Sequence, residues 1–247
     1  MKRFLTLLKI EGKIAVRGID GIFFGVFMPV GIAILIGFIC GDKPAYEGAA
    51  HTFLEASFPA LITVGICATA FMGIPLGLSD YRDKKILKHF FVTPVSPMLL
   101  LMVQVAINFL NSLVSATAIL LVMKFVFGYR MRGSKIGFLF AYILVLISMY
   151  ALGMMLASLC RTLKVANLVC TLIYFPMLFL SGATIPYEIL PQALQKAANI
   201  LPLTQGIKLL KGFSMGTGKT EILVPSIIMI TVAAAGIIIS IKKFRWE

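Results

Sequence analysis

The stretch "FPALITVGICATAFMGIPLGLSDYRDKKILKHFFVTPVSP", residues 58–97, joins an apolar segment directly to a charged one. Residues 58–78 contain no Asp, Glu, Lys or Arg, and a bilayer core needs about 20 apolar residues per helix. The charged residues that follow give way to a short apolar group and end at Pro94 and Pro97. The stretch therefore predicts a membrane-spanning helix followed by a short amphipathic segment outside the membrane.

Five further runs of the same kind flank this one, at 22–40, 98–123, 136–159, 165–182 and 222–241. None of them contains Asp, Glu, Lys or Arg. Over the whole chain 60% of the residues are hydrophobic and 13% are charged, and the charged share is about half that of a soluble domain. We therefore predict an all-α membrane protein: one domain over residues 1–247, with six transmembrane helices in a membrane core at 22–241.

The distribution of basic residues predicts the orientation of the chain. With six spans the two termini lie on one side together with the second and fourth loops, and that side holds the majority of the 23 Lys and Arg residues. Because cytoplasmic loops collect Lys and Arg, both termini are expected in the cytoplasm of a bacterium, as part of a multi-pass protein of its plasma membrane. The net charge of +13 then reflects orientation, not binding to nucleic acid. The basic loop at 128–135 runs against the rule.

The first 21 residues show a helical pattern of basic side chains. Lys2, Thr6, Lys9 and Lys13 follow one another at steps of four, three and four, which places them on one face. This pattern predicts an interfacial helix with its basic face toward lipid headgroups, and an ordinary positively charged flank is the alternative. Residues 242–247 are expected to form a cytoplasmic tail.

The loop after the second span carries the signals of a helix start. Ser79 or Asp80 can act as a helix cap, and Asp83 suits the first turn of a helix. We therefore predict a short amphipathic cytoplasmic helix between the second and third spans. Such a helix is either a basic interfacial connector or a docking element for a cytoplasmic partner.

Prolines predict where the helices are interrupted. Pro75, flanked by glycines, should kink or end the second span. After the fifth span, Pro186, Pro191 and Pro202 divide the chain into pieces too short to cross a membrane. We read these pieces as external re-entrant or interfacial half-helices, because non-helical backbone at membrane depth must be covered by protein or line a cavity.

Polar residues share one face of the third span: Gln104, Asn108, Asn111 and Ser115. Such a face does not point at lipid. Hydrogen bonding between helices is the preferred interpretation, and a substrate path is the second. The fifth span has a similar face, formed by Asn167, Thr171, Tyr174 and Ser181, and it contains Pro176. For this face both interpretations remain open.

The sequence "GTGKT" at 216–220 resembles the end of a phosphate-binding loop. That loop requires a glycine five residues before Gly218, where Phe213 stands, and it requires a preceding buried strand. We predict neither a nucleotide site nor any other cofactor or metal site in this chain. The four cysteines form no C-x-x-C motif, and His51 and His89 fall on opposite sides of the predicted membrane.

The order of these elements resembles the membrane subunit of a type-2 ATP-binding-cassette exporter over nearly the whole chain. The basic amphipathic start, the six spans, "YRDKKILKHFFVTPVSP" at 81–97 and "LSGATIPYEILPQALQKAANILPLTQGIKLLKG" at 180–212 carry the resemblance. The family often has Glu-Arg where Tyr81-Arg82 stands, so the residue that makes the docking ion pair is left open.

The resemblance implies a homodimer, or a heterodimer with a similar permease, bound to two cytoplasmic ATPase subunits that hold ATP and magnesium. It implies that residues 79–93 form the coupling helix, with the contacts made by Asp80, Tyr81, Arg82, Asp83, Lys84, Lys85, Ile86 and Leu87. It implies a translocation path lined from the second and fifth spans by Thr63, Cys67, Phe71, Asn167, Thr171 and Tyr174. It implies an external gate within 183–201 that includes Pro186, Tyr187, Glu188 and Pro191.

The residues themselves favour an energy source outside the spans. A secondary transporter coupled to ions normally carries ionisable groups in its membrane core, and the six apolar runs have none. An ion-coupled secondary transporter or channel is therefore the alternative to an exporter permease, and a membrane enzyme comes third. The apolar or neutral path residues suit a drug, a peptide or a lipid-linked glycan alike, and the resemblance implies that this substrate is moved out of the cell.

Overall fold

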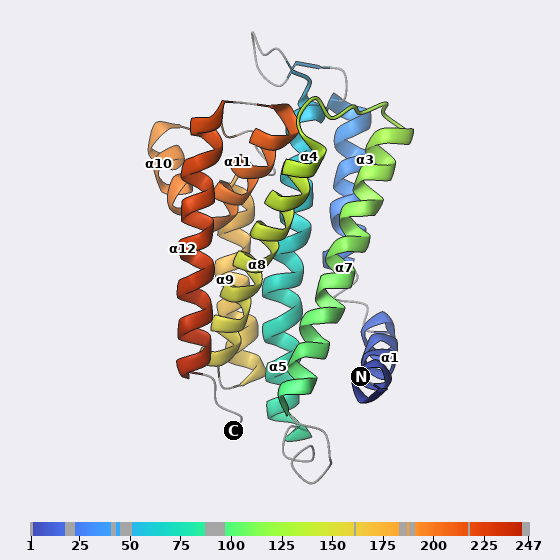
Figure 1. The fold of residues 1–247 in the computed structure, drawn as a ribbon, viewed down its shortest axis with the longest axis vertical. Helices are drawn as coiled ribbons and strands as arrows, with labels where there is room; N and C mark the ends of the chain where they lie inside the picture. The colour runs from blue at the N-terminus through green and yellow to red at the C-terminus, as the bar shows by residue number, and fades with distance from the viewer. Residues whose placement is uncertain are drawn as a thin grey trace.

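The computed structural model describes residues 2–17, 23–40, 43–44, 51–86, 97–160, 162–182, 187, 191–216 and 218–243, and its regular elements there are helices (Figure 1). The elements in chain order are α1 (Lys2–Arg17), η1 (Phe23–Phe27), α3 (Met28–Cys40), α4 (Phe53–Ala68), η2 (Thr69–Gly73), α5 (Ile74–Asp83), α7 (Pro97–Phe125), α8 (Lys135–Leu159), α9 (Leu163–Leu180), α10 (Gln192–Ile200), α11 (Pro202–Met215) and α12 (Lys219–Lys243). The all-α prediction is confirmed.

Among the described residues, 5 helical segments are long and apolar enough to cross a membrane. They are Phe53–Asp83, Leu99–Phe125, Lys135–Leu159, Leu163–Leu180 and Glu221–Lys243, and they correspond to the second through sixth predicted runs. The first predicted run is helical as well, but its apolar helix, Gly25–Ile39, is shorter than a span requires. The described residues therefore agree with a multi-pass membrane protein that has 5 candidate spans by length and composition.

Local capping explains where several helices begin. Thr52 and Glu55 form a capping box at the start of α4, in which the Glu55 N–H donates to Thr52 Oγ1 and the Thr52 N–H donates to the Glu55 carboxylate. Ser134 Oγ accepts the Gly137 N–H at the start of α8, and Thr162 Oγ1 accepts the Val165 N–H at the start of α9. These contacts satisfy N–H groups that the first helical turn leaves without partners.

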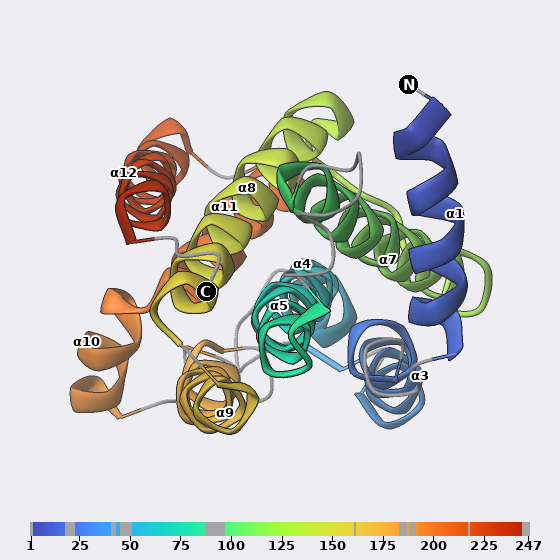
Figure 2. The same cartoon turned by 90° about the horizontal axis from the view of Figure 1, so that it is seen from below.

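The segment α4–η2–α5 is the central helix of the bundle and the most buried of the candidate spans (Figure 2). Pro75 does not end this helix, which continues to Asp83. The five-residue π-helix η2 lies directly before α5, in which Pro75 is the second residue. In η2 the Thr69 hydroxyl lies 2.9 Å from the Ile66 carbonyl oxygen and 3.1 Å from the Tyr150 hydroxyl of α8. The helix is thus continuous, with a π-helical turn bonded to its neighbour at its middle.

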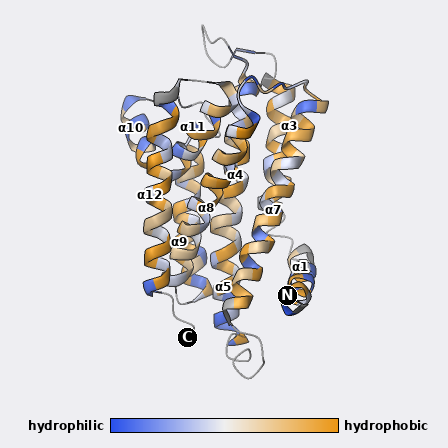
Figure 3. Cartoon of the chain, in the orientation of Figure 1, coloured by the Kyte–Doolittle hydropathy of each residue, from blue (hydrophilic) through white to orange (hydrophobic). Residues whose placement is uncertain are grey.

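The bundle has two polar ends, which Figure 3 shows as hydrophilic residues above and below the apolar length of the helices. We call the end that carries α1 and the last turn of α5 the α1 end (Figure 1). At the opposite end α10 contacts α9 and α11 contacts α12, and the Gly133 N–H donates to the Ser214 carbonyl. There Arg132 of the basic 128–135 loop pairs with Glu55 at 3.0 Å.

Candidate functional site

The last turn of α5 occupies the place where the sequence predicts a new helix. Ser79 and Asp80 do not begin a helix; they lie within α5, which ends at Asp83. Lys84 and Lys85 then form a turn, with a positive φ of 56° at Lys85. The Asp80 carboxylate, predicted as a cap, instead pairs with Lys84 at 2.8 Å one turn along. The predicted helix start is therefore wrong, and Leu87 and residues 88–93 lie outside the described residues.

Tyr81 connects α5 to the N-terminal helix α1. Its hydroxyl donates to Glu11 Oε2 of α1, and Gln104 Nε2 of α7 donates to the same carboxylate oxygen at 3.1 Å. Gln104 Nε2 also lies 3.1 Å from the Tyr81 hydroxyl. Three residues from three helices thus share one polar contact, and Glu11 is only 7% exposed there.

Arg82 connects α5 to the end of α8. Its Nη1 donates to the carbonyl oxygens of Ala157 at 2.5 Å and Cys160 at 2.9 Å. These carbonyls belong to the last turn of α8, where an α-helix leaves its final carbonyls without N–H partners. A cation at this position also interacts favourably with the helix dipole.

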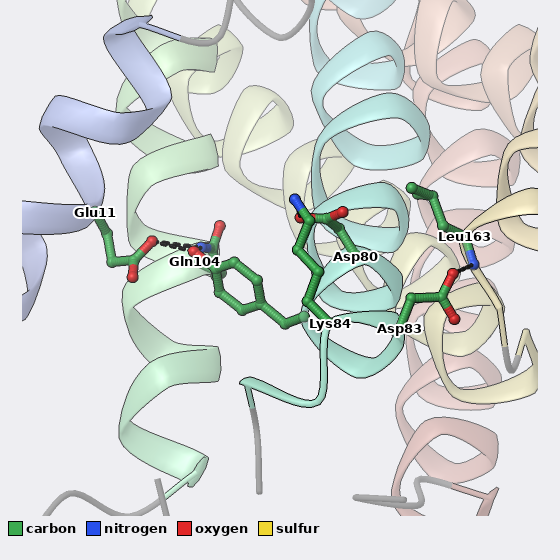
Figure 4. A network of polar contacts seen from close by, with 7 residues as sticks. Glu11, Asp80, Asp83, Lys84, Gln104 and Leu163 are labelled. Carbon is green, nitrogen blue, oxygen red and sulfur yellow. Dashed lines mark hydrogen bonds and ion pairs between the residues drawn. The ribbon is translucent and has the colours of Figure 1, made fainter. Parts of the chain in front are cut away.

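Asp83 connects α5 to the start of α9. Its Oδ2 accepts the backbone N–H of Leu163, the first residue of α9, at 2.8 Å (Figure 4). A carboxylate at a helix N-terminus is favourable because it satisfies an orphan N–H group and complements the dipole. We call Tyr81, Arg82 and Asp83, with the groups that they contact, the α5 junction.

The α5 junction joins the central helix to four others through three consecutive residues. Tyr81 reaches α1 and α7, Arg82 reaches α8 and Asp83 reaches α9. A displacement of the end of α5 therefore acts on all four helices. Arg82 and Asp83, which the resemblance places among the contacts to an ATPase, have the contacts described here within their own chain.

Sequence reasoning missed Glu11, although the sequence contains a signal for it. Glu11 is the one acidic residue in α1, and it falls on the side of the helix that carries Phe4, Leu8 and Ala15. A lone acid among apolar side chains indicates a buried partner. That partner is Tyr81, seventy positions away in the chain, and only the fold brings the two together.

The polar face of α7 packs against the central helix. Asn108 is 6% exposed, and its Nδ2 donates to the Gln104 carbonyl at 2.9 Å. Its Oδ1 lies so close to Gly73 that a Cβ at Gly73 would come within 2.0 Å of it. Ser115 is also buried beside Gly65. Of this face, Gln104 makes the expected hydrogen bonds between helices, to Glu11 and Tyr81, whereas Asn108 bonds within α7 and packs, like Ser115, against a glycine of the central helix.

The residues predicted to line a path fall into two environments. Thr63, Cys67 and Phe71 of the central helix are each at most 1% exposed, and the Thr63 hydroxyl donates to the Pro59 carbonyl of its own helix. On α9, Asn167 is exposed, whereas Tyr174 is 0% exposed. Thr171 is partly exposed, and its Oγ1 donates to Asn167 Oδ1 at 3.5 Å. The buried residues lie inside this chain, and only Asn167 and Thr171 reach its surface.

The predicted gate is described at two of its residues. Tyr187 donates from its hydroxyl to the Gln195 carbonyl, and its ring lies 4.3 Å below the ammonium of Lys208 in α11. The same ammonium donates to Asn199 Oδ1. Pro191 caps α10 and is exposed, while Pro186 and Glu188 lie outside the described residues. Short helices α10 and α11 are present where half-helices were predicted.

The "GTGKT" segment lies between two helices. Gly216 ends α11 in the left-handed conformation, with φ 73°, and α12 begins at Lys219. The residue that stands at the required glycine position, Phe213, is part of α11. A phosphate-binding loop needs a strand at this point, so the local geometry differs from such a loop.

Known proteins match a large part of this sequence. Inner membrane transport permease YhhJ of Escherichia coli (strain K12) is 24% identical over 166 residues, which are 66% of this chain and 44% of that protein. The protein of the same name from Shigella flexneri matches with the same identity and extent. The matched part thus spans less than half the length of these curated relatives. The family model described as ABC-2 type transporter matches residues 2–213, and the chain therefore belongs to this family of membrane permease subunits of ABC transporters.

Proposed function

We propose that the chain is the permease subunit of an exporter that moves a drug, a peptide or a lipid-linked glycan out of the cell. ATP would be hydrolysed by a separate ATPase, which would hold the ATP and magnesium. The observation that supports this proposal is the α5 junction: the loop expected to meet the ATPase follows a helix end that is bonded to four other helices. A displacement of that loop by a partner would move the helix ends at the α1 end of the bundle together. Alternation between two packings, driven by a partner, requires such a coupling.

The contacts of the α5 junction change which residues we assign to docking. Arg82 and Asp83 hold α8 and α9, whereas Lys84, Lys85 and the partly exposed Ile86 follow them outward. We propose that the docking surface begins at these three residues and continues through the segment to residue 93. Two ATPase subunits would bind a pair of permeases, each permease through this surface on the cytoplasmic side of the plasma membrane.

We further propose that the path forms between two permease copies beside α9. Asn167 and Thr171 are polar and reach the surface of the chain, where Thr171 donates to Asn167 and lipid would offer the amide N–H groups of Asn167 no acceptor. A second copy, or a related permease, would cover them. Tyr174 and the central-helix residues Thr63, Cys67 and Phe71 would join the path only when the bundle opens. The α10–α11 region, with Tyr187 held by Lys208, would gate its external end.

Affinity purification from native membranes tests the proposal. The wild-type permease should co-purify with an ATPase, and the double change Lys84→Glu, Lys85→Glu should release it while the permease stays in the membrane. The matched control is Lys242→Glu, Lys243→Glu, which makes the same change of charge at exposed residues at the end of α12. Recovery of wild-type permease without any ATPase would contradict the proposal and favour an ion-coupled transporter.

A further inference from the structure

Helix α1 presents chemically different sides. One side packs on the bundle: Glu11 is buried, and the residues beside it are partly buried, namely Phe4, Leu8 and Ala15. Lys9 and Lys13 are exposed on the opposite side, about half a turn away from Glu11. Ile10 is 51% exposed and Ile14 is 55% exposed, and both lie between these two sides.

Glu11 determines how α1 sits on the bundle. A buried carboxylate is costly unless it is hydrogen-bonded, and this one accepts from Tyr81 of α5 and Gln104 of α7. Both donors are fixed on long helices. The position and rotation of α1 are thus linked to Tyr81, the first residue of the α5 junction.

The outer side of α1 has the chemistry of a helix that lies on an anionic lipid surface. Its exposed lysines attract negative headgroups, and its exposed isoleucines can enter the boundary of the acyl chains. The helix also lies at the level where the spans end (Figure 1). An acidic protein surface would match the lysines but would leave Ile10 and Ile14 against polar groups, so lipid is the better occupant.

We propose that anionic phospholipid headgroups bind the Lys9–Lys13 side of α1 and regulate the transporter through Glu11. Glu11 is the positioning residue: it passes a change in the position of α1 to Tyr81, and through the α5 junction to α8 and α9. The regulatory part of this proposal rests on the proposed function, since it assumes a partner ATPase whose rate the α5 junction controls. The link between α1 and Tyr81 does not depend on it.

The first test measures ATP hydrolysis by the complex in vesicles of phosphatidylcholine and in an equimolar mixture with phosphatidylglycerol. The wild-type rates should differ by at least about threefold between the two, because each lysine near an anionic surface contributes appreciably to binding. Either the pair Lys9→Gln, Lys13→Gln or the single change Glu11→Gln should remove the difference. The control pair Lys242→Gln, Lys243→Gln should keep it. A complex that hydrolyses ATP equally in both lipids, or a Glu11→Gln variant that keeps the full difference, overturns the regulatory proposal.

The second test needs no ATPase. Spin labels are placed at Leu5 of α1 and Lys164 of α9, both exposed, in a permease whose native cysteines are replaced by serine. The distance between the labels should have one narrow distribution, and Glu11→Gln should broaden it, since apolar packing and lipid would then hold α1 without the charged contact to Tyr81 and Gln104. A label pair at Lys164 and Lys243 should stay unchanged and so shows that the bundle has folded.

The two tests separate the two proposals. An unchanged narrow distribution in the Glu11→Gln variant overturns the role of Glu11. Broadening in that variant, together with a wild-type permease that binds no ATPase, supports the link through Glu11 and contradicts the proposed function.

Discussion

The carboxylate of Asp83 accepts the backbone N–H of Leu163, so the last residue of α5 caps the first residue of α9. The two residues are 80 positions apart, and the contact spans 2.8 Å. The contact joins the end of the helix that contains the second apolar run, 58–78, to the start of the helix that contains the fifth, 165–182. Any motion imposed at the end of α5 therefore reaches α9 directly, without passing through the interior of the bundle.

We expect Asp83→Ala to loosen the start of α9 more than Asp83→Asn does. Alanine leaves the Leu163 N–H without this acceptor, whereas asparagine keeps an acceptor and loses only the attraction of a negative charge to the helix dipole. The cost for alanine should be about 0.5–1 kcal/mol. Thermal unfolding of the permease in detergent measures it, with Thr162→Ala as the comparison because Thr162 caps the same helix. If Thr162→Ala lowers the stability and Asp83→Ala does not, the contact between Asp83 and Leu163 does not form in solution.

Arg82→Met should be more damaging than Arg82→Lys. Methionine leaves the carbonyls of Ala157 and Cys160 without their charged donor, and a hydrogen bond to a charged group contributes about 1.5–3 kcal/mol. Lysine keeps the charge but not the forked geometry of the guanidinium, so its effect should be intermediate. The measurement is the yield and unfolding temperature of purified permease. If Arg82→Met folds normally and only loses its ATPase, then Arg82 serves docking and not the end of α8.

Gly153→Ala tests the packing of α8 against η2. An added Cβ would come within 2.2 Å of the Ala70 carbonyl oxygen, which belongs to the backbone and cannot swing aside. Such overpacking costs about 1–3 kcal/mol. Gly31→Ala in α3 is the control, because nothing lies within 4 Å of its added Cβ. Unfolding in detergent should separate the two variants, and an unaffected Gly153→Ala variant would mean that α8 and η2 lie farther apart.

The sequence predicts the helices well because an apolar run of membrane length can satisfy its backbone N–H and C=O groups in few structures other than a helix. It fails at Ser79 and Asp80, since a polar residue after an apolar run can begin a new helix or continue the old one. Backbone geometry decides between them, and here α5 continues to Asp83. The contacts of Glu11 with Tyr81 and Gln104 depend on helices that are distant in the chain, so no local pattern contains them. The polar face of α7 can be predicted from the sequence, because its residues follow one another at the spacing of an α-helix.

Tyr174 tests whether the path opens inside the chain. Its side chain is 0% exposed, and its hydroxyl has no hydrogen-bond partner among the described residues, which is costly for a buried polar group. A second conformation in which water or substrate meets this hydroxyl would remove that cost. We therefore expect Tyr174→Cys, in a permease without other cysteines, to react slowly with a small polar thiol reagent at rest. Under ATP turnover it should react at least about tenfold faster, as a minor open state becomes populated.

Two further positions on α9 make this labelling experiment decisive. Asn167→Cys should react in both conditions, because Asn167 is already exposed and polar surroundings are expected there. Leu172→Cys should react in neither, although Leu172 is 63% exposed, because its surface is apolar and faces lipid, which excludes the reagent. If Tyr174→Cys stays inert during turnover while Asn167→Cys reacts, the path runs along the outer face of α9 and the core residues Thr63, Cys67 and Phe71 are structural. If Leu172→Cys reacts as fast as Asn167→Cys, then the aqueous path lies on the face of α9 that we assign to lipid.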